Sequence, residues 1–514
     1  MRRTWIGLFV LGVVVAMPAG AEDAAPKSGA PPGRAKSAVT TVPPTPRGAS
    51  AVEIELERLR ELIQEQSKEL EAQRAVLREQ QKRLEALAEE LRGLRANRDT
   101  PAATPSARSS LAAVAQSQEG FEETKKSAEN SIKRFGPFRF SGDLRLRSDS
   151  FFGGGALTGS APTSRHREQF RLRFSADAKF SDEFSGGFSI ASGETGNPVA
   201  ANQSLTNFFL RKPISIDKAF VTYTPRWFKP FQVTAGRWGY TWYRTELTWD
   251  NDLNPEGVSE ALHFNWKDSL LEHLGIVAFQ MPLLEVSAGA DSAVFGGQLQ
   301  TNWKLHKRVR FGAYAAYYDY RKPDSLAANQ VGSGPGTPTG VLAGNNNTNS
   351  FGVIDGRRIF ASKFGVVNVI ARLDVDTSLH RFPLLLQFDF AQNTQACANR
   401  GAFTAAGLTP PFCNPRARHA YWSEIQFGRT EEKDDLRLGY TFVRIEREAI
   451  VSAFNFSDLP AATNVANHRL EIFYQAYRNI TLGLTGLIGR QLVTSTSAPE
   501  RWLKRLQLDL LYKF

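Results

Sequence analysis

The sequence of 514 residues lacks the cysteine-rich segments of disulfide scaffolds and the long apolar segments of helical membrane proteins. It has two cysteines, which excludes a domain held together by several disulfides. Apart from one run near the N-terminus, no stretch approaches about 18 consecutive apolar residues. The mean hydropathy of −0.32 also argues against a bundle of membrane helices. Strands that alternate apolar and polar residues remain compatible with a membrane.

The sequence also lacks a pattern typical of an enzyme. Its 7 histidines are scattered, without the spacing of metal ligands and without an obvious nucleophile motif nearby. We therefore predict no catalytic residues, no cofactor and no metal site, and a hydrolase is an unsupported alternative. The net charge of +11 is compatible with nucleic acid, with anionic lipid or with a lumen that conducts anions.

Residues 1–21 have the features of a cleaved secretory signal peptide. Arg2 and Arg3 precede a short apolar run, and the triplet Ala19-Gly20-Ala21 provides an A-x-A cleavage site. An uncleaved membrane anchor is the alternative, but the apolar run is short for a bilayer. Because the sequence predicts export, nucleic acid is not an expected partner.

A predicted coiled coil over residues 51–97 lies between two linkers. The linkers, residues 22–50 and 98–135, are rich in small and polar residues and cannot bury a core. Between them, apolar residues recur at steps of three and four over about six heptads. Three core positions hold glutamine instead, at Gln66, Gln73 and Gln80. These polar layers favour a parallel homotrimer, and a single helix lying on a surface is the alternative.

From residue 136 to residue 514 the pattern is that of β-strands throughout. One clear run places apolar residues at alternate positions from Phe170 to Phe180, with Arg171, Arg173 and Lys179 between them. The links between such runs alternate along the chain between short and mostly long. This alternation is typical of an antiparallel membrane barrel, here with about 16 strands and an accepted range of about 14 to 18. A secreted β-sandwich or β-helix is the alternative.

The last segment, Arg501 to Phe514, alternates apolar and polar residues and ends in an aromatic residue. Leu506, Leu508 and Leu510 share one face with Tyr512 and Phe514. This ending resembles the C-terminal signal by which bacterial barrel proteins are recognised for assembly. The expected partners are therefore the barrel-assembly machinery during biogenesis and outer-membrane lipid afterwards.

The chain resembles the putative porins, a family of outer-membrane barrels with an N-terminal periplasmic coiled coil. The resemblance covers residues 136–514 and is best in the first third. The segments that carry it are 140–147, 171–174, 216–221, 235–237 and 249–258. It implies an outer-membrane channel for passive diffusion of small solutes, with the coiled coil in the periplasm and without catalytic residues.

Several basic side chains are predicted to line the pore. If the apolar faces meet lipid, the lumen receives Arg139, Arg145, Arg147, Arg171, Arg173 and Lys179. Rings of basic residues favour anions, which predicts a modest anion preference. The alternative is that these side chains pair with Asp143, Asp177 and other neighbours across strands, giving a stiff wall without selectivity.

Two long loops carry the remaining predicted sites. Loop 239–258 is rich in aromatic residues and is the expected constriction, with the carboxylates Glu246, Asp250, Asp252 and Glu256. An ordinary surface loop is one alternative for it, and a calcium site is another, although Pro255 stands where a calcium-binding loop of the EF-hand type needs glycine. In loop 394–418, Cys397 and Cys413 are predicted to form a disulfide because the protein is exported.

A structural role is the alternative function. The predicted coiled coil would reach about 70 Å at about 1.5 Å per residue, and it would tether the barrel to the cell wall by binding peptidoglycan. Tethering and a pore function are compatible with each other.

Overall fold

The computed structural model describes most of the chain from Phe138 to the C-terminus. The described residues are 138–153, 164–205, 208–287, 291–330, 342, 348–493 and 502–514. The predicted signal peptide, the coiled coil 51–97 and both linkers lie outside these residues and stay predictions. Among the described residues, no helix has the length and hydropathy needed to cross a membrane.

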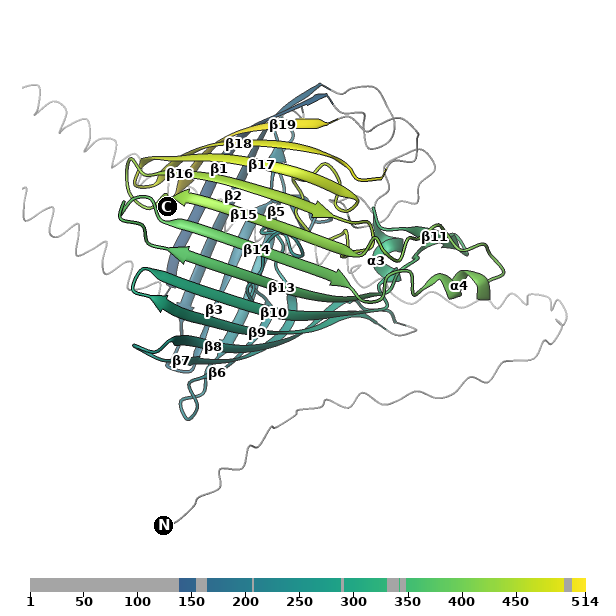
Figure 1. Ribbon diagram of the computed structural model, residues 1–514, viewed down its shortest axis with the longest axis horizontal. Helices are drawn as coiled ribbons and strands as arrows, with labels where there is room; N and C mark the ends of the chain where they lie inside the picture. The colour runs from purple at the N-terminus through teal and green to yellow at the C-terminus, as the bar shows by residue number, and fades with distance from the viewer. Residues whose placement is uncertain are drawn as a thin grey trace, which may run out of the picture. The chain divides into compact units, whose positions relative to one another are not determined.

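One antiparallel sheet of 17 strands closes on itself as a barrel (Figure 1). Its strands are β1 (Phe138–Gly153), β2 (Arg165–Lys179), β3 (Phe184–Ser192), β4 (Gln203–Ser204), β5 (Ile214–Tyr223), β6 (Phe231–Arg237), β7 (Glu256–Asn265), β8 (Leu271–Leu284), β9 (Ser292–His306), β10 (Val309–Arg321), β13 (Phe364–Val375), β14 (Leu384–Asn393), β15 (His419–Gly428), β16 (Leu436–Ile445), β17 (Val465–Tyr477), β18 (Ile480–Gln491) and β19 (Leu503–Lys513). Because β3 and the two-residue β4 both pair with β2 and share one position, 16 strand positions surround the interior. The predicted antiparallel barrel of about 16 strands is confirmed.

The strands follow from the period-2 pattern of the sequence, since successive side chains of a strand point to opposite faces. On β19, Leu508 is 52% exposed on the outer face, whereas Gln507 and Arg505 are buried on the inner face. The same division holds on β1, where Phe140 and Leu146 face outward and Arg147 is buried inside. An apolar outer face and a polar inner face are the arrangement expected of a barrel surrounded by lipid.

The barrel closes where the first strand pairs with the last. Asp143 of β1 lies opposite Lys513 of β19, and Gly142 and Phe514 exchange two backbone hydrogen bonds of 2.8 and 3.0 Å. Gly142 is needed for this close approach, because a Cβ atom at that position would lie 2.5 Å from the ring of Phe514. The terminal aromatic residue therefore packs directly on the closing seam.

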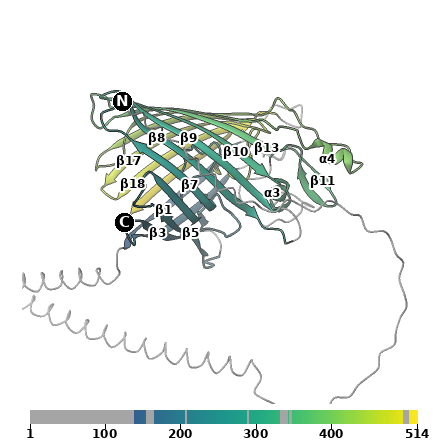
Figure 2. The same ribbon diagram turned by 90° about the horizontal axis from the view of Figure 1, so that it is seen from below.

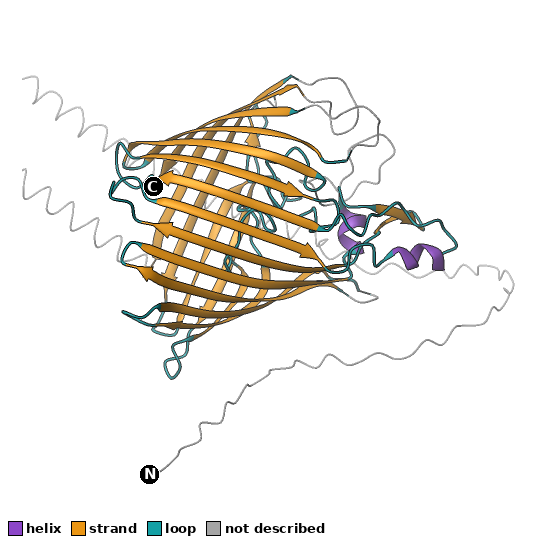
Figure 3. Ribbon diagram, viewed as in Figure 1, coloured by secondary structure: helices purple, strands orange, loops and turns teal. Residues whose placement is uncertain are grey.

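Short links lie at one end of the barrel, which we call the turn end, and long links lie at the other, the loop end. Both β1 and β19 have their terminal ends at the turn end. The loop end carries the hairpin β11 (Phe351–Ile354) and β12 (Arg357–Phe360), and the helices α3 (Asp324–Asn329) and α4 (Arg400–Ala405) (Figure 3). Figure 2 shows the same barrel from a direction at right angles.

The loop end also contains the two cysteines of the chain. Cys397 and Cys413 are joined in the structure, on either side of α4. Cys413 is buried, and the backbone N–H of Cys397 donates a 2.9 Å hydrogen bond to Ser362 Oγ. The bond therefore ties the loop that carries α4 close to the segment that leads into β13.

This arrangement predicts that the protein carries no free thiol. Maleimide labelling of the unfolded but unreduced protein should add no label, whereas labelling after reduction should add two. Mass spectrometry of the labelled chain measures the outcome. Labelling of Cys397 or Cys413 without reductant would contradict the disulfide.

Candidate functional site: the barrel lumen

Three segments that connect strands at the loop end fold into the barrel instead of extending outward. The first inward segment is 193–202, the second is 238–255 and the third is 446–464. Val199 in the first and Ile450 in the third are almost inaccessible to solvent. Links that are this buried are unusual, because connecting segments generally lie on the surface. These three segments therefore occupy the lumen.

Aromatic side chains hold the second inward segment against one wall. Trp242 stacks on Phe279 of β8 with ring centroids 4.0 Å apart, and Trp249 meets Tyr318 of β10 edge to face at 5.5 Å. Trp249 also stacks on Phe454 of the third segment at 5.7 Å. Offset-stacked and edge-to-face rings add stabilisation beyond the apolar area that they bury. The second segment is thus packed against β8 and β10 and against the third segment.

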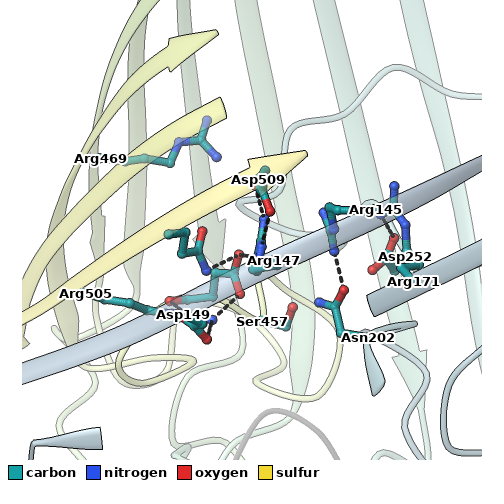
Figure 4. Close-up of polar contacts among 12 residues, drawn as sticks. Arg145, Arg147, Asp149, Arg171, Asn202, Asp252, Ser457, Arg469, Arg505 and Asp509 are labelled. Atoms are coloured by element: carbon teal, nitrogen blue, oxygen red, sulfur yellow. Dashed lines mark hydrogen bonds and ion pairs between the residues drawn. The ribbon is translucent and has the colours of Figure 1, made fainter. Parts of the chain in front are cut away.

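The wall made by β1, β2 and β19 carries a cluster of arginines (Figure 4). We call it the arginine patch, and it consists of Arg145, Arg147, Arg171 and Arg505. Arg145 lies directly opposite Arg171 on the neighbouring strand. Like charges opposite each other destabilise a sheet, so the patch requires anionic or polar partners.

Some partners of the arginine patch come from the wall itself. Arg147 Nε donates to Asp509 Oδ1 at 2.7 Å, and Arg505 Nε donates to Asp149 Oδ1 at 2.7 Å. Both contacts cross the closing seam between β1 and β19, and they have a second hydrogen bond each, at 2.8 and 2.9 Å. Such bidentate pairs between arginine and carboxylate are among the strongest hydrogen-bonded side-chain contacts.

Each inward segment supplies a further partner. Asn202 of the first segment accepts a 2.5 Å hydrogen bond from Arg145. Asp252 of the second lies 3.2 Å from Arg171. Asp458 of the third lies 3.0 Å from Arg147 and 2.9 Å from Arg505. All three segments are therefore attached to one patch of the wall.

The second segment also reaches the walls beyond the patch. Glu246 lies 3.2 Å from Arg469 of β17, and Thr245 donates a 2.6 Å hydrogen bond to Asp389 of β14. Tyr243 donates a hydrogen bond to Gln387, also on β14. Because β6 and β7, which flank the segment, lie far from β14 in the strand order, the segment crosses the lumen.

The carboxylates of the inward segments differ in their tendency to hold a proton. Burial alone would raise the pKa of Asp458, but Arg505 and Arg147 hold it well below its usual range. Burial raises the pKa of Glu246 to about 6, although Arg469 opposes the shift. Burial and the nearby carboxylates also raise the pKa of Asp250. Asp458 therefore stays ionised in mild acid.

The residues predicted to line the pore have different positions. Arg145, Arg147 and Arg171 form the patch with Arg505, and Arg173 lies 2.7 Å from Asp143. Arg139 and Lys179 are exposed near the turn end, where Lys179 lies 3.6 Å from Asp182. The sequence left cross-strand pairing of these arginines open as an alternative. Such pairing occurs at Asp143 of β1, which forms ion pairs with both Arg171 and Arg173 of β2.

Three of the four predicted constriction carboxylates, Glu246, Asp250 and Asp252, lie in the second inward segment. Glu256 instead begins β7, where it is paired with Arg237 and more than half exposed. Backbone N–H groups of Asp252 and Ser457 donate hydrogen bonds of 2.8 Å to Asp250. No group of three metal-ligating side chains occurs among the residues that the structure describes.

Sequence reasoning missed Asn202, Asp458, Arg469 and Arg505. Asp458 had a detectable signal, because its loop contains an apolar run that includes Ile450, Phe454 and Phe456. A surface loop does not usually carry such a run, so it indicates burial. Arg505 lies on the inward face of the last strand, where the alternating pattern alone gives its position.

Comparison with known proteins adds to this geometry. Residues 156–339 match the family model described as "Putative porin". This match confirms the resemblance to the putative porins. With the closed barrel, it supports an outer-membrane channel rather than an enzyme. In bacterial outer-membrane barrels, short turns like those of the turn end face the periplasm. Among curated proteins, none matches the chain significantly.

Several solved structures are similar to this chain at low sequence identity. OprB of Pseudomonas putida, at high pH, is 12% identical over 74% of this chain and 94% of its own, with a TM-score of 0.45. OmpF of Salmonella typhi, in complex with daunomycin, is 10% identical over 73% and 97%, with a TM-score of 0.40. The outer-membrane channel DcaP of Acinetobacter baumannii is 11% identical over 73% and 97%, with a TM-score of 0.39.

The contacts of Asp458 predict its effect on ion selectivity. Replacing it by asparagine (Asp458→Asn) removes a negative charge about 3 Å from two guanidinium groups. The chloride-to-potassium permeability ratio should rise by about two- to tenfold, since one unit charge at about 4 Å is worth about 1 kcal/mol in water. Zero-current potentials of planar bilayers in a KCl gradient measure the ratio.

Asp355→Asn is the matched control, because Asp355 is exposed at the tip of the β11–β12 hairpin. It should leave the ratio unchanged. An unchanged or lower ratio in Asp458→Asn would show that Asp458 does not offset the charge of the patch.

Proposed function

We propose that the channel allows small hydrophilic solutes and ions to diffuse passively across the outer membrane, with a modest preference for anions. The observation that carries the preference is the environment of Arg145. Within the described part of the chain, no carboxylate lies in ion-pair distance of Arg145, whose polar partner is the neutral side chain of Asn202. The other three patch arginines each contact a carboxylate.

Cavities border the first inward segment toward both ends of the barrel, close to the contact between Arg145 and Asn202. The cavity toward the loop end has a volume of about 290 Å³ and is lined by Ala200 and Asn202. The cavity toward the turn end has a volume of about 530 Å³ and is lined by Ala201 and Asp252. Asn202, which bonds Arg145, lines the first cavity and its neighbour Ala201 lines the second, so we infer that a solute passing between them moves close to Arg145. A guanidinium without a direct ion pair at such a point favours anions.

The three inward segments also support a limit on solute size. A barrel with 16 strands encloses an aqueous channel when its interior is open. Here the aromatic packing at β8–β10 and the contacts at the arginine patch fill much of that space. The expected solutes are therefore small, and their diffusion needs no conformational change of the protein.

The predicted homotrimer rests on the glutamine layers of residues 51–97 and stays a prediction. The same holds for peptidoglycan binding by the coiled coil and for recognition of the C-terminal strand by the barrel-assembly machinery.

Arg145 gives the sharpest test of the selectivity. Arg145→Gln removes this guanidinium charge, so the chloride preference of the wild-type channel should fall to near equality with potassium. Arg139→Gln is the control, because Arg139 shares the strand face of Arg145 but is exposed near the turn end and is not part of the arginine patch. Single-channel recordings in a salt gradient compare the three proteins. A cation-selective wild type, or an equal effect of both substitutions, would refute the proposal.

A further inference from the structure

The cavity toward the loop end has the features of a binding site and not only of a passage. Its walls come from β2, β4, the first and third inward segments and β19. Its volume is about 290 Å³. The usual range for small-molecule sites begins at roughly 300 Å³, so this cavity is close to the lower end of that range. A solute the size of a single sugar or hydroxy acid is the largest that such a site would enclose.

Two glutamines in this cavity each have one buried polar atom without a hydrogen-bond partner among the described residues. Gln169 of β2 and Gln203 of β4 are each only 6% exposed and both line the cavity. The Oε1 atom of Gln169 and the Nε2 atom of Gln203 are buried without a partner in the described structure. Buried polar side chains are nearly always hydrogen-bonded, so these amides are expected to meet a polar group that enters the cavity.

The remaining groups of the lining contain more hydrogen-bond donors than acceptors. The Oδ1 atom of Asn202 already accepts from Arg145, which leaves its amide N–H groups for another partner. Lys212 has no ion pair within the described residues, and its ammonium group can only donate. Of the two carboxylates in the lining, Asp458 is engaged by Arg147 and Arg505.

Glu194, the other lining carboxylate, is exposed at the margin of the cavity. The interior thus presents mainly N–H groups, together with the hydroxyls of Ser204 and Ser457. A complementary solute has an excess of acceptor oxygens and hydroxyls that bond the amides.

We propose that this cavity is a binding site for a small hydroxylated carboxylate on its way through the channel. The proposal rests on the proposed pore function and adds the class of solute to it. The carboxylate would lie toward Lys212 and Asn202, and the hydroxyls would meet Gln169 and Gln203. Arg145, which bonds Asn202 on the path to the next cavity, keeps the route favourable for the negative charge.

Three probes of similar size separate charge from hydroxyl recognition. Gluconate carries a carboxylate, glucitol is neutral, and glucosamine carries an ammonium group. Each is added to a single channel of the full-length protein in a planar bilayer, and the concentration that halves the ion current is measured. Gluconate should interrupt the current at the lowest concentration, glucitol at a higher one, and glucosamine at the highest.

Variants link the effect to the cavity. In Gln169→Ala and in Lys212→Gln, the half-blocking concentration of gluconate should rise by roughly tenfold, which corresponds to the loss of about one good hydrogen bond. Gln426→Ala is the matched control, because Gln426 lies on β15 and does not line this cavity. For glucitol, Gln169→Ala should weaken the block while Lys212→Gln should not.

The outcomes separate this inference from the pore function. Ion current without block by gluconate, equal block by gluconate and glucitol, or equal effects in Gln426→Ala and Gln169→Ala would each overturn the binding site while leaving the pore intact. Absence of ion current in the wild type would instead overturn the pore function itself. Block in the expected order, weakened in both cavity variants, would support the site.

Discussion

The lumen depends on one constraint, which is that four arginines concentrated on β1, β2 and β19 need partners for their charges. Burying a charge away from water costs several kcal/mol of free energy. Only well-placed partners offset this cost. The wall provides Asp149 and Asp509 for this purpose. Asn202, Asp252 and Asp458 provide the rest, one from each inward segment. The need to satisfy the arginine patch therefore determines where these three segments lie.

A second kind of contact acts at the opposite wall. There the second inward segment packs its tryptophan rings on β8 and β10, and Phe454 of the third segment packs on Trp249, so that burial of apolar surface provides the stabilisation. One wall thus holds the segments by charge and the other by apolar packing. Together they leave cavities that border the first inward segment, whose Asn202 bonds Arg145. The proposed selectivity and the proposed limit on solute size rest on the same set of contacts.

The fold was largely predictable from the sequence, whereas the site was predictable only in part. Strand alternation and link lengths are local features, so they predicted the barrel and its closure at Phe514. The inward position of Arg147 followed from the same alternation. Its partner Asp458 did not, since 311 residues separate the two. Likewise 356 residues separate Arg505 from Asp149, and only the register of the closing strands brings them together. A pattern of residue types cannot assign such pairs.

Amide hydrogen exchange over residues 446–464 tests most directly whether the arginine patch holds the inward segments in the lumen. The wild-type protein in lipid or detergent should show slow exchange of these amides, comparable to that of the strands. The double variant Arg147→Gln/Arg505→Gln should exchange them much faster while β8–β10 stay protected. Rapid exchange of 446–464 in the wild type, or equal protection in the double variant, would contradict the account.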